Sequence, residues 1–417
     1  MRLQYQKIIS NTDILLNVFS KLVTLLLSVF IAIVVSTKLS DVDRGVFFTF
    51  LALSSSSVLF DLGLNNIAVQ YLSHNSDRLT YQEQFIQTVV INSKKISFLL
   101  FLTLSFVGYI LFASYDFTVI LSWVLFSISS AFYFQYNLRL SIFEGQAYTK
   151  KASKFRFSYT AINSILLLFL LWFKIGLFSL SIAQIVAIVL NKKAFFFDFS
   201  ESNPNFLFNY RSEVWPLQKR HAITALSAFI AGGAIVPYSF TLSPAFAGQL
   251  GFTLSITNAL IIFATTIIQT KNSFYCRILV ESGPREYKLI YFKHAMPLFV
   301  ITAILGLCLY FLLENHCLTF IINPDSILSG VDLFLLFVIV LSQLLVYLIS
   351  TFVRNFKIEP FTVQSVITSF FLLVFLAINF FLNGDQSSIV MILVLVNIGI
   401  SLPICLYIYN THIRRLS

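Results

Sequence analysis

Long apolar runs alternate with short polar segments along the whole chain. A helix that crosses a bilayer needs about 20 mainly apolar residues, because lipid offers no partners to backbone polar groups. Twelve segments meet or approach this length. The pattern therefore predicts an all-α polytopic membrane protein with spans near residues 14–35, 46–71, 96–115, 118–138, 158–173, 175–190, 221–242, 247–268, 294–313, 331–352, 361–382 and 388–409.

The composition agrees with this pattern. Of the 417 residues, 58% are hydrophobic and only 11% are charged, whereas soluble domains carry about 25% charged residues. The four cysteines show no CxxC spacing, which argues against a disulfide framework or a zinc site. A soluble enzyme and a secreted disulfide scaffold are therefore excluded.

The net charge of +10 reflects the expected topology. If the N-terminus is cytoplasmic, 24 of the 28 Lys and Arg residues lie in cytoplasmic segments and three lie in outside loops. The remaining one, Lys21, is the only basic residue within a predicted span. Such a bias is typical of the positive-inside rule. We therefore expect both termini in the cytoplasm (N-in/C-in) and no nucleic acid as a partner.

The longest connection, residues 191–220, divides the spans into six and six. It mixes aromatic and basic residues, which suits a segment at the cytoplasmic membrane surface, although an ordinary linker remains the alternative. Leu, Ser and Gly recur after spans one and seven at an offset of 203 residues. We predict an N-terminal six-helix lobe over 1–190, a cytoplasmic interfacial linker over 191–220, and a C-terminal six-helix lobe over 221–417, related as a parallel repeat.

Polar side chains recur every three or four residues on several spans and therefore share a helix face. Polar groups inside a membrane are candidates for function, although hydrogen bonds between neighbouring helices explain any single stripe equally well. On the first two spans, the candidates for a substrate-binding cavity are Asn17, Lys21, Thr24, Ser57, Asp61 and Asn65.

Lys21 and Asp61 lie deepest among the charged candidates. At 1.5 Å per residue, Lys21 is about 10 Å inside the first span and Asp61 about 15 Å from the cytoplasmic end of the second. They could form a pair in the inner half of the membrane. Alternatively, Lys21 extends to the interface and Asp61 binds a neighbouring helix.

Helix-breaking residues interrupt the seventh span. Gly232, Gly233 and Pro237 lie within six residues of one another. Because proline removes one backbone hydrogen bond, this segment is a candidate hinge or gate. Incidental tolerance of these residues in a membrane is the alternative.

No motif in the sequence predicts catalysis. HxxxH, HExxH, Walker and GxSxG patterns are missing, and no loop is long enough to form a catalytic domain. We therefore expect neither an enzyme nor a bound metal or cofactor.

Three short motifs resemble a known family. Arg44-Gly45-Val46-Phe47-Phe48 leads into Leu59-Phe60-Asp61-Leu62-Gly63-Leu64-Asn65-Asn66, Phe143-Glu144-Gly145-Gln146 follows the fourth span, and Gly248 opens the eighth. Together with twelve spans, they resemble the Wzx-type flippases of the multidrug/oligosaccharidyl-lipid/polysaccharide (MOP) exporter superfamily. Those proteins commonly show a Gly opening span two and an Asp-(Leu/Phe)-Gly-Leu near its cytoplasmic end.

The resemblance implies a fold and a function. The expected fold has two six-helix lobes in a V, as in MATE-like transporters. The implied activity is movement of an undecaprenyl-diphosphate-linked oligosaccharide, an O-antigen or polysaccharide repeat unit, from the cytoplasmic to the periplasmic leaflet by alternating access. The implied location is the bacterial inner membrane. Membrane lipids, a polysaccharide polymerase and a chain-length regulator are the implied partners.

The resemblance also suggests residue roles. Family members line their cavity with cationic groups that attract the pyrophosphate, so Lys21 is the candidate pyrophosphate contact. Arg44 and Arg354 are candidates for the cavity rim, and Asp61 would titrate or pair with Lys21 during switching.

Two other functions remain in competition. A MATE-like drug or cation antiporter would share the fold but would need more acidic residues in its cavity. An O-antigen polymerase generally needs a large periplasmic loop with arginines, and this sequence has none.

Overall fold

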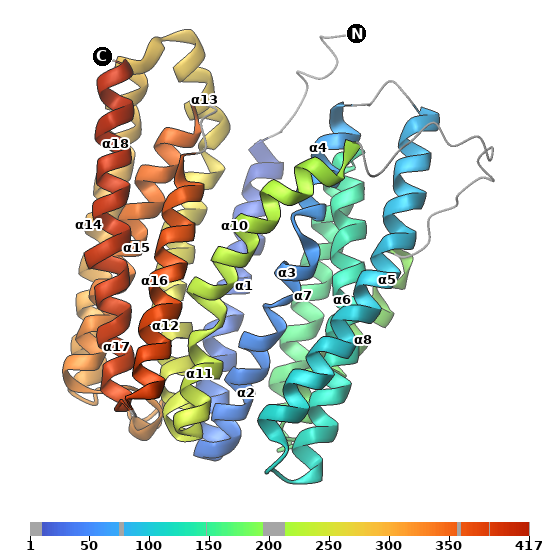
Figure 1. Cartoon of the computed structure of the whole chain (residues 1–417), viewed down its shortest axis with the longest axis vertical. Coiled ribbons are helices and arrows are strands. Elements are labelled where there is room, and N and C mark those ends of the chain that lie inside the picture. The colour runs from blue at the N-terminus through green and yellow to red at the C-terminus, as the bar shows by residue number, and fades with distance from the viewer. Residues whose placement is uncertain are drawn as a thin grey trace. The chain divides into compact units, whose positions relative to one another are not determined.

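The computed structural model describes residues 11–74, 79–146, 148–194, 213–356, 360–382 and 384–416. Within these ranges every regular element is helical (Figure 1). Ten of the described helices are long and apolar enough to cross a membrane, and two shorter apolar helices, Val23–Lys38 and Phe178–Leu190, coincide with the predicted first and sixth spans. The chain is therefore an all-helical, multi-pass membrane protein.

The chain forms two compact units. The first, here called the continuous unit, comprises residues 38–241. Its elements are α2 (Asp41–Ser54), α3 (Ser57–Asp61), α4 (Leu64–His74), α5 (Leu79–Phe112), α6 (Phe117–Gly145), α7 (Thr149–Trp172), α8 (Phe178–Leu190), the 3₁₀ helix η1 (Lys192–Ala194), α10 (Trp215–Gly233) and α11 (Ile235–Leu242).

The second, here called the split unit, joins residues 1–37 to residues 242–417. Its elements are α1 (Asn11–Lys38), α12 (Pro244–Thr270), α13 (Asn272–Glu281), α14 (Gly283–Glu314), the 3₁₀ helix η2 (Pro324–Ser326), α15 (Gly330–Arg354), α16 (Phe361–Phe381), α17 (Gln386–Val394), the π-helix η3 (Leu395–Ser401) and α18 (Leu402–Leu416).

This division differs from two lobes that follow each other along the chain. The predicted lobes were 1–190 and 221–417, but α1 belongs to the split unit, and α10 and α11 belong to the continuous unit. The predicted first span therefore groups with the second half of the chain, and the predicted seventh span groups with the first half. The predicted linker, residues 191–220, lies mostly outside the described residues.

Several helices are longer than the predicted spans. The sequence predicts loops over 72–95, 139–157 and 269–293, whereas α5, α6, α7, α13 and α14 fill most of these ranges. The predicted boundaries followed charged residues, but Lys, Arg, Glu and Gln are good helix formers. A charge ends the apolar run without ending the helix.

Close packing around Trp123 holds α5 against α6 in the continuous unit. The indole is 1% exposed, and its N–H donates to the carbonyl oxygen of Leu104 over 2.8 Å. The ring lies 4.7 Å from that of Phe50 and 5.7 Å from that of Phe112, between centroids. Gly108 makes this possible, since a Cβ there would lie 1.7 Å from the indole nitrogen. In lipid such shape complementarity and internal hydrogen bonds drive helix association.

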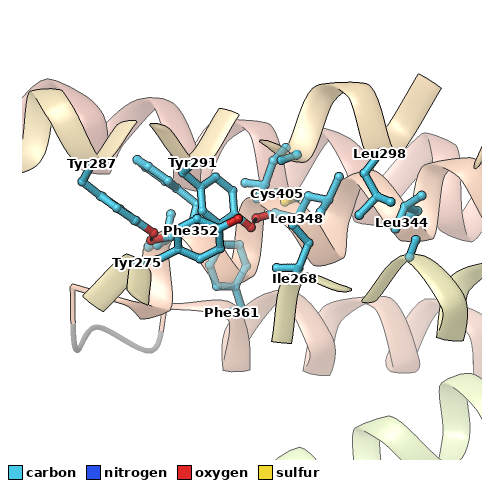
Figure 2. Packing of buried hydrophobic residues seen from close by; sticks show 14 of the residues in the cluster. Ile268, Tyr275, Tyr287, Tyr291, Leu298, Leu344, Leu348, Phe352, Phe361 and Cys405 are labelled. Atoms are coloured by element: carbon cyan, nitrogen blue, oxygen red, sulfur yellow. Dashed lines mark hydrogen bonds between the residues drawn. The ribbon is translucent and has the colours of Figure 1, made fainter. Parts of the chain in front are cut away.

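A tyrosine cluster likewise holds α14 against α15 in the split unit. The hydroxyls of Tyr287 and Tyr291 donate to the carbonyls of Phe352 and Leu348 over 3.0 and 2.8 Å. The two tyrosines are four residues apart on α14, and the two carbonyls are four residues apart on α15. The second bond therefore repeats the first one helical turn further along both helices. Figure 2 shows Tyr275 and these two tyrosines gathered around Phe352, whose ring stacks on Tyr287 at 4.8 Å. The hydroxyls are buried and satisfied, which avoids the cost of an unpaired polar group.

We expect Gly108→Ala to destabilise the continuous unit, because the added methyl group must displace Trp123 and break its bond to Leu104. Overpacking of this kind costs about 1–3 kcal/mol, which thermal unfolding of the detergent-purified protein would detect as a lower midpoint. Gly306→Ala is the matched control. Its Cβ would lie 3.5 Å from the nearest atom, an ordinary contact, so an equal loss of stability in both variants would contradict this explanation.

Candidate functional site

The second predicted span is three helices rather than one. α2 ends at Ser54, α3 covers only Ser57–Asp61, and α4 begins at Leu64. Between α2 and α3 the backbone bonds shorten from four residues to three. The N–H groups of Ser56, Val58 and Leu59 donate to carbonyls three residues earlier, over 2.8–3.2 Å. A 3₁₀ stretch inside a spanning helix is typical of a hinge.

Serine side chains stabilise this first break. The hydroxyls of Ser54 and Ser55 donate to the carbonyls of Leu51 and Ala52 over 2.8 and 2.6 Å. Both carbonyls also accept the backbone N–H of Ser55 over 3.2 Å. The serine hydroxyls therefore add local side-chain bonds that compete with the regular helical pattern. The run of four serines at 54–57 therefore allows the helix to break there.

The Asp-Leu-Gly-Leu motif forms the second break. Leu62 and Gly63 both have left-handed backbone angles, with φ of 46° and 74°. Glycine adopts this conformation without strain, whereas leucine does not. The Asp61 carboxylate then accepts the N–H of Asn65 over 3.1 Å, in the first turn of α4. A carboxylate is favoured there because the unpaired N–H groups of a helix start carry partial positive charge.

Polar atoms cluster around this second break. Ser57, Asp61 and Asn65 are all half-buried. The side-chain oxygen of Asn65 is buried and has no hydrogen-bond partner among the described residues. Buried acceptors of this kind usually bind water or a ligand. Asp61 and Asn65 therefore meet at this break, and Ser57 lies one turn before it, at the start of α3.

The seventh predicted span is broken as well. α10 ends at Gly233 and α11 begins at Ile235. In a regular helix the carbonyl of Gly233 would accept the N–H of residue 237. Residue 237 is proline, which has no N–H, so this bond is missing. Tyr238 restores the helical pattern by donating to Ala234 over 3.1 Å. The breakers found in the sequence thus separate two helices.

The two broken spans meet at their breaks. α10 packs against α3 (Figure 1). A Cβ at Gly233 would lie 2.7 Å from the Ser55 hydroxyl oxygen and 2.7 Å from the Phe229 ring, whereas one at Gly232 would meet nothing within 4 Å. Glycine at 233 is therefore required for the close approach, and glycine at 232 is not.

A carboxylate anchors the start of α10 to the same unit. Glu213 accepts the hydroxyls of Tyr71, over 2.5 Å, and Tyr81. Val214 is fully buried in a cluster with residues of α4, α5 and α6, and Tyr71 stacks on Phe85 at 4.4 Å. Both ends of α10 are thus attached to the continuous unit, which explains why it groups with that unit. Glu213 does not stand out in the sequence, because it precedes the predicted seventh span by eight residues.

The Phe143-Glu144-Gly145-Gln146 motif at the end of α6 packs on α4, the helix that follows Asp61. A Cβ at Gly145 would lie 2.9 Å from the carbonyl oxygen of Ala68 and 2.9 Å from the Cβ of Leu72. Only glycine lets the end of α6 lie this close to α4. Glu144 forms an ion pair with Arg156 over 2.7 Å.

Arg44 is fully buried in the first turn of α2, not open to solvent as a rim residue would be. Its guanidinium forms an ion pair with Asp41. Ser40 caps the same helix by accepting the N–H of Asp43 over 3.2 Å. This geometry favours a structural role for Arg44 at the start of α2.

The other predicted residues belong to the split unit. Thr24 is exposed on α1, and Arg354 is exposed as the last residue of α15. The backbone of Asn17 and Lys21 is helical, but their side chains lie outside the described part of the structure. Lys21 and Asp61 therefore belong to different units.

Arg139 lies in a helix and not in the loop that the sequence predicts there. α6 continues to Gly145, so Arg139 lies six residues, about 9 Å, before the end of an apolar spanning helix. Its side chain is 9% exposed. The apolar run from Phe117 to Phe143, which it interrupts, was the available signal. No group of His, Cys, Asp or Glu in the described ranges could hold a metal ion.

Gly233→Ala should lower the stability of the purified protein by about 1–3 kcal/mol, because the new methyl group overlaps Ser55 and Phe229. Gly232→Ala is the matched control and should be neutral or slightly stabilising. Both are read from the thermal unfolding midpoint. Adding Ser55→Ala to Gly233→Ala should recover part of the loss if the two breaks touch. Strict additivity of the two changes would contradict this contact.

The chain is similar in structure to known transporters. An inward-facing multidrug resistance MATE family transporter of the MOP superfamily matches with a TM-score of 0.73 and 12% identity, over 96% of this chain and 98% of that one. A MOP superfamily transporter from Pyrococcus furiosus Vc1 matches with a TM-score of 0.59 and 12% identity, over 97% and 96%. A MATE protein in its bent conformation matches with a TM-score of 0.56 and 14% identity, over 96% and 93%.

Sequence comparisons add no relative: no protein-family model matches the chain, and no curated protein sequence does. The structural matches extend over nearly the full length of both partners. The chain therefore has the fold of the MATE transporters of the MOP superfamily.

Proposed function

We propose that this protein is a Wzx-type flippase. It moves an undecaprenyl-diphosphate-linked oligosaccharide, a repeat unit of O-antigen or another polysaccharide, from the cytoplasmic to the periplasmic leaflet. In this proposal the chain has twelve spans in two six-helix lobes, lies in the bacterial inner membrane, and has both termini in the cytoplasm.

One observation carries the proposal beyond a general transporter. The Asp61-Leu62-Gly63-Leu64 motif, which resembles the Wzx-type sequence, forms a structured break in a spanning helix. Each of its positions has a physical role, since Asp61 caps α4, Leu62 and Gly63 turn the chain, and Leu64 is fully buried where α4 begins. A motif that builds an irregular segment within a membrane supports a functional origin.

Alternating access requires bodies that move relative to each other and segments that bend. The chain supplies two compact units and breaks at Ser55, Leu62 and Ala234. Gly232, Gly233 and Pro237 are proposed as the hinge or gate. Segments whose helical bonds are already interrupted bend more readily than a regular helix.

The charge and polarity of each side chain suggest its proposed role. Lys21 would contact the pyrophosphate, because a cation close to apolar surroundings attracts phosphate strongly. Asp61 would pair with a cation or titrate during switching. Asn17, Thr24, Ser57 and Asn65 would bind sugar hydroxyls, and Arg354 would lie at the cavity rim. A polysaccharide polymerase and a chain-length regulator are the proposed partners.

A MATE-like drug or cation antiporter is the alternative, because the fold fits it equally well. Such a protein would want several acidic groups in its spans. Asp61 is the one carboxylate among the residues proposed for the cavity.

Deletion of the gene distinguishes the two functions. A flippase predicts loss of surface glycan and accumulation of undecaprenyl-diphosphate-linked repeat units in the inner leaflet. An antiporter predicts normal glycan together with greater sensitivity to toxic cations. The second result would overturn the proposal.

We expect Asp61→Asn and Asp61→Ala to separate capping from transport. Asn caps helices about as well as Asp, whereas Ala costs about 0.5–2 kcal/mol. Asp61→Asn should therefore unfold near the wild-type temperature and still lower surface glycan severalfold, because it lacks the charge. Normal glycan in Asp61→Asn, with loss only in Asp61→Ala, would reduce Asp61 to a structural cap.

Lys21→Ala should weaken substrate binding about ten- to hundredfold, the usual range for losing a hydrogen bond to a charged group. Lys21→Arg should restore most of the activity. Surface glycan is measured at matched membrane levels of each variant, and Lys174→Ala, at an exposed turn before α8, is the control. Normal glycan in Lys21→Ala would remove the pyrophosphate role while leaving the flippase proposal open to the deletion test.

A further inference from the structure

An apolar groove lies between α6 and α8 of the continuous unit. Its volume is about 360 Å³, and it is lined by Phe132, Ile185, Ile188, Val189 and Lys192. Pockets that hold small molecules span about 300–1,000 Å³. The groove is therefore large enough for a flexible apolar chain.

The groove runs along one face of α8 towards its C-terminal end. Residues 185, 188, 189 and 192 follow the spacing of a single helix face. Phe132 is 50% exposed and Val189 is 56% exposed, so the groove opens on the surface of the unit. Since both helices are apolar, an exposed apolar hollow here faces lipid acyl chains.

The end of the groove is strongly basic. Lys192 closes its lining, and Lys193 follows in η1. Ala194, in the same short helix, is buried in one cluster with Phe143 and Ala152, and Lys151 holds its ammonium 4.5 Å from the centre of the Phe143 ring. Lys151, Lys192 and Lys193 therefore lie at the same end of the groove, and the proposed topology places this end at the cytoplasmic surface.

We infer that this groove binds an anionic phospholipid of the cytoplasmic leaflet. One acyl chain lies against Phe132, Ile185 and Val189, and the phosphate lies among Lys151, Lys192 and Lys193. Each lysine close to an anionic membrane surface raises the affinity of a protein for anionic lipid about fivefold. The groove supplies the chain contacts that a basic patch alone lacks. This site is separate from the candidates for oligosaccharide binding. It rests on the proposed topology but not on the proposed flippase activity.

Native mass spectrometry of the full-length detergent-purified protein tests the inference, with dioleoyl-phosphatidylglycerol and dioleoyl-phosphatidylcholine as probes. Wild-type protein should retain one phosphatidylglycerol in preference to phosphatidylcholine. Lys192→Gln should weaken that retention about fivefold, and Val189→Trp, which fills the groove, should abolish the preference. Both side chains are exposed, so both variants should fold.

Matched controls lie in the split unit. Lys288→Gln removes an exposed lysine of α14, and Val363→Trp enlarges a 63% exposed side chain of α16. Both should retain phosphatidylglycerol as the wild type does. Unchanged retention in Lys192→Gln and Val189→Trp, or equal losses in the controls, would overturn the inference.

A photoreactive residue at position 189 tests the occupant in native membranes. Crosslinking to phospholipid supports the inference. Crosslinking to another protein would replace it with a helix-docking surface, and competition by undecaprenyl phosphate for the same adduct would assign the groove to the transported lipid; either result overturns it.

Discussion

Every backbone polar group within lipid must find a partner inside the protein, and this constraint governs where the chain can depart from a regular helix. The breaks in the continuous unit occur where side chains form local bonds to the backbone or where proline removes a backbone donor. The hydroxyls of Ser54 and Ser55 add local bonds to the carbonyls of Leu51 and Ala52. The Asp61 carboxylate takes an N–H of the new helix. Pro237 removes the N–H that would otherwise bond the carbonyl of Gly233.

The same logic explains why the compact units do not follow the two halves of the chain. α10 is attached at its start through Glu213, whose carboxylate accepts two tyrosine hydroxyls, and at its end through the close approach of Gly233 to Ser55. Because α10 is attached at both ends to residues of the continuous unit, it groups with that unit, although a short connection joins α11 to α12.

The apolar runs predicted the helical class and the positions of the long spans. Gly232, Gly233 and Pro237 predicted the break in the seventh span, and the short motifs predicted the superfamily fold. Periodicity could not predict that Asp61 and Asn65 would bond, or that the serine run would end a helix, because those outcomes depend on backbone angles rather than polarity. Arg139 and Glu213 were placed in loops since a charge interrupts an apolar run, although it does not interrupt a helix. The grouping of α1 and α10 depends on contacts between residues far apart in the chain, which one sequence does not reveal.

The continuation of α5 beyond its apolar part has a mechanical consequence. Its residues 79–95 precede the predicted span, and at 1.5 Å per residue they form a rod about 25 Å long. Because rod and span are one unbroken helix, any tilt within the membrane swings the distal tip through a proportionally larger arc. Tyr81, on this rod, binds Glu213 at the start of α10. The extension of α5 therefore connects its membrane-spanning part directly to the base of the broken seventh span.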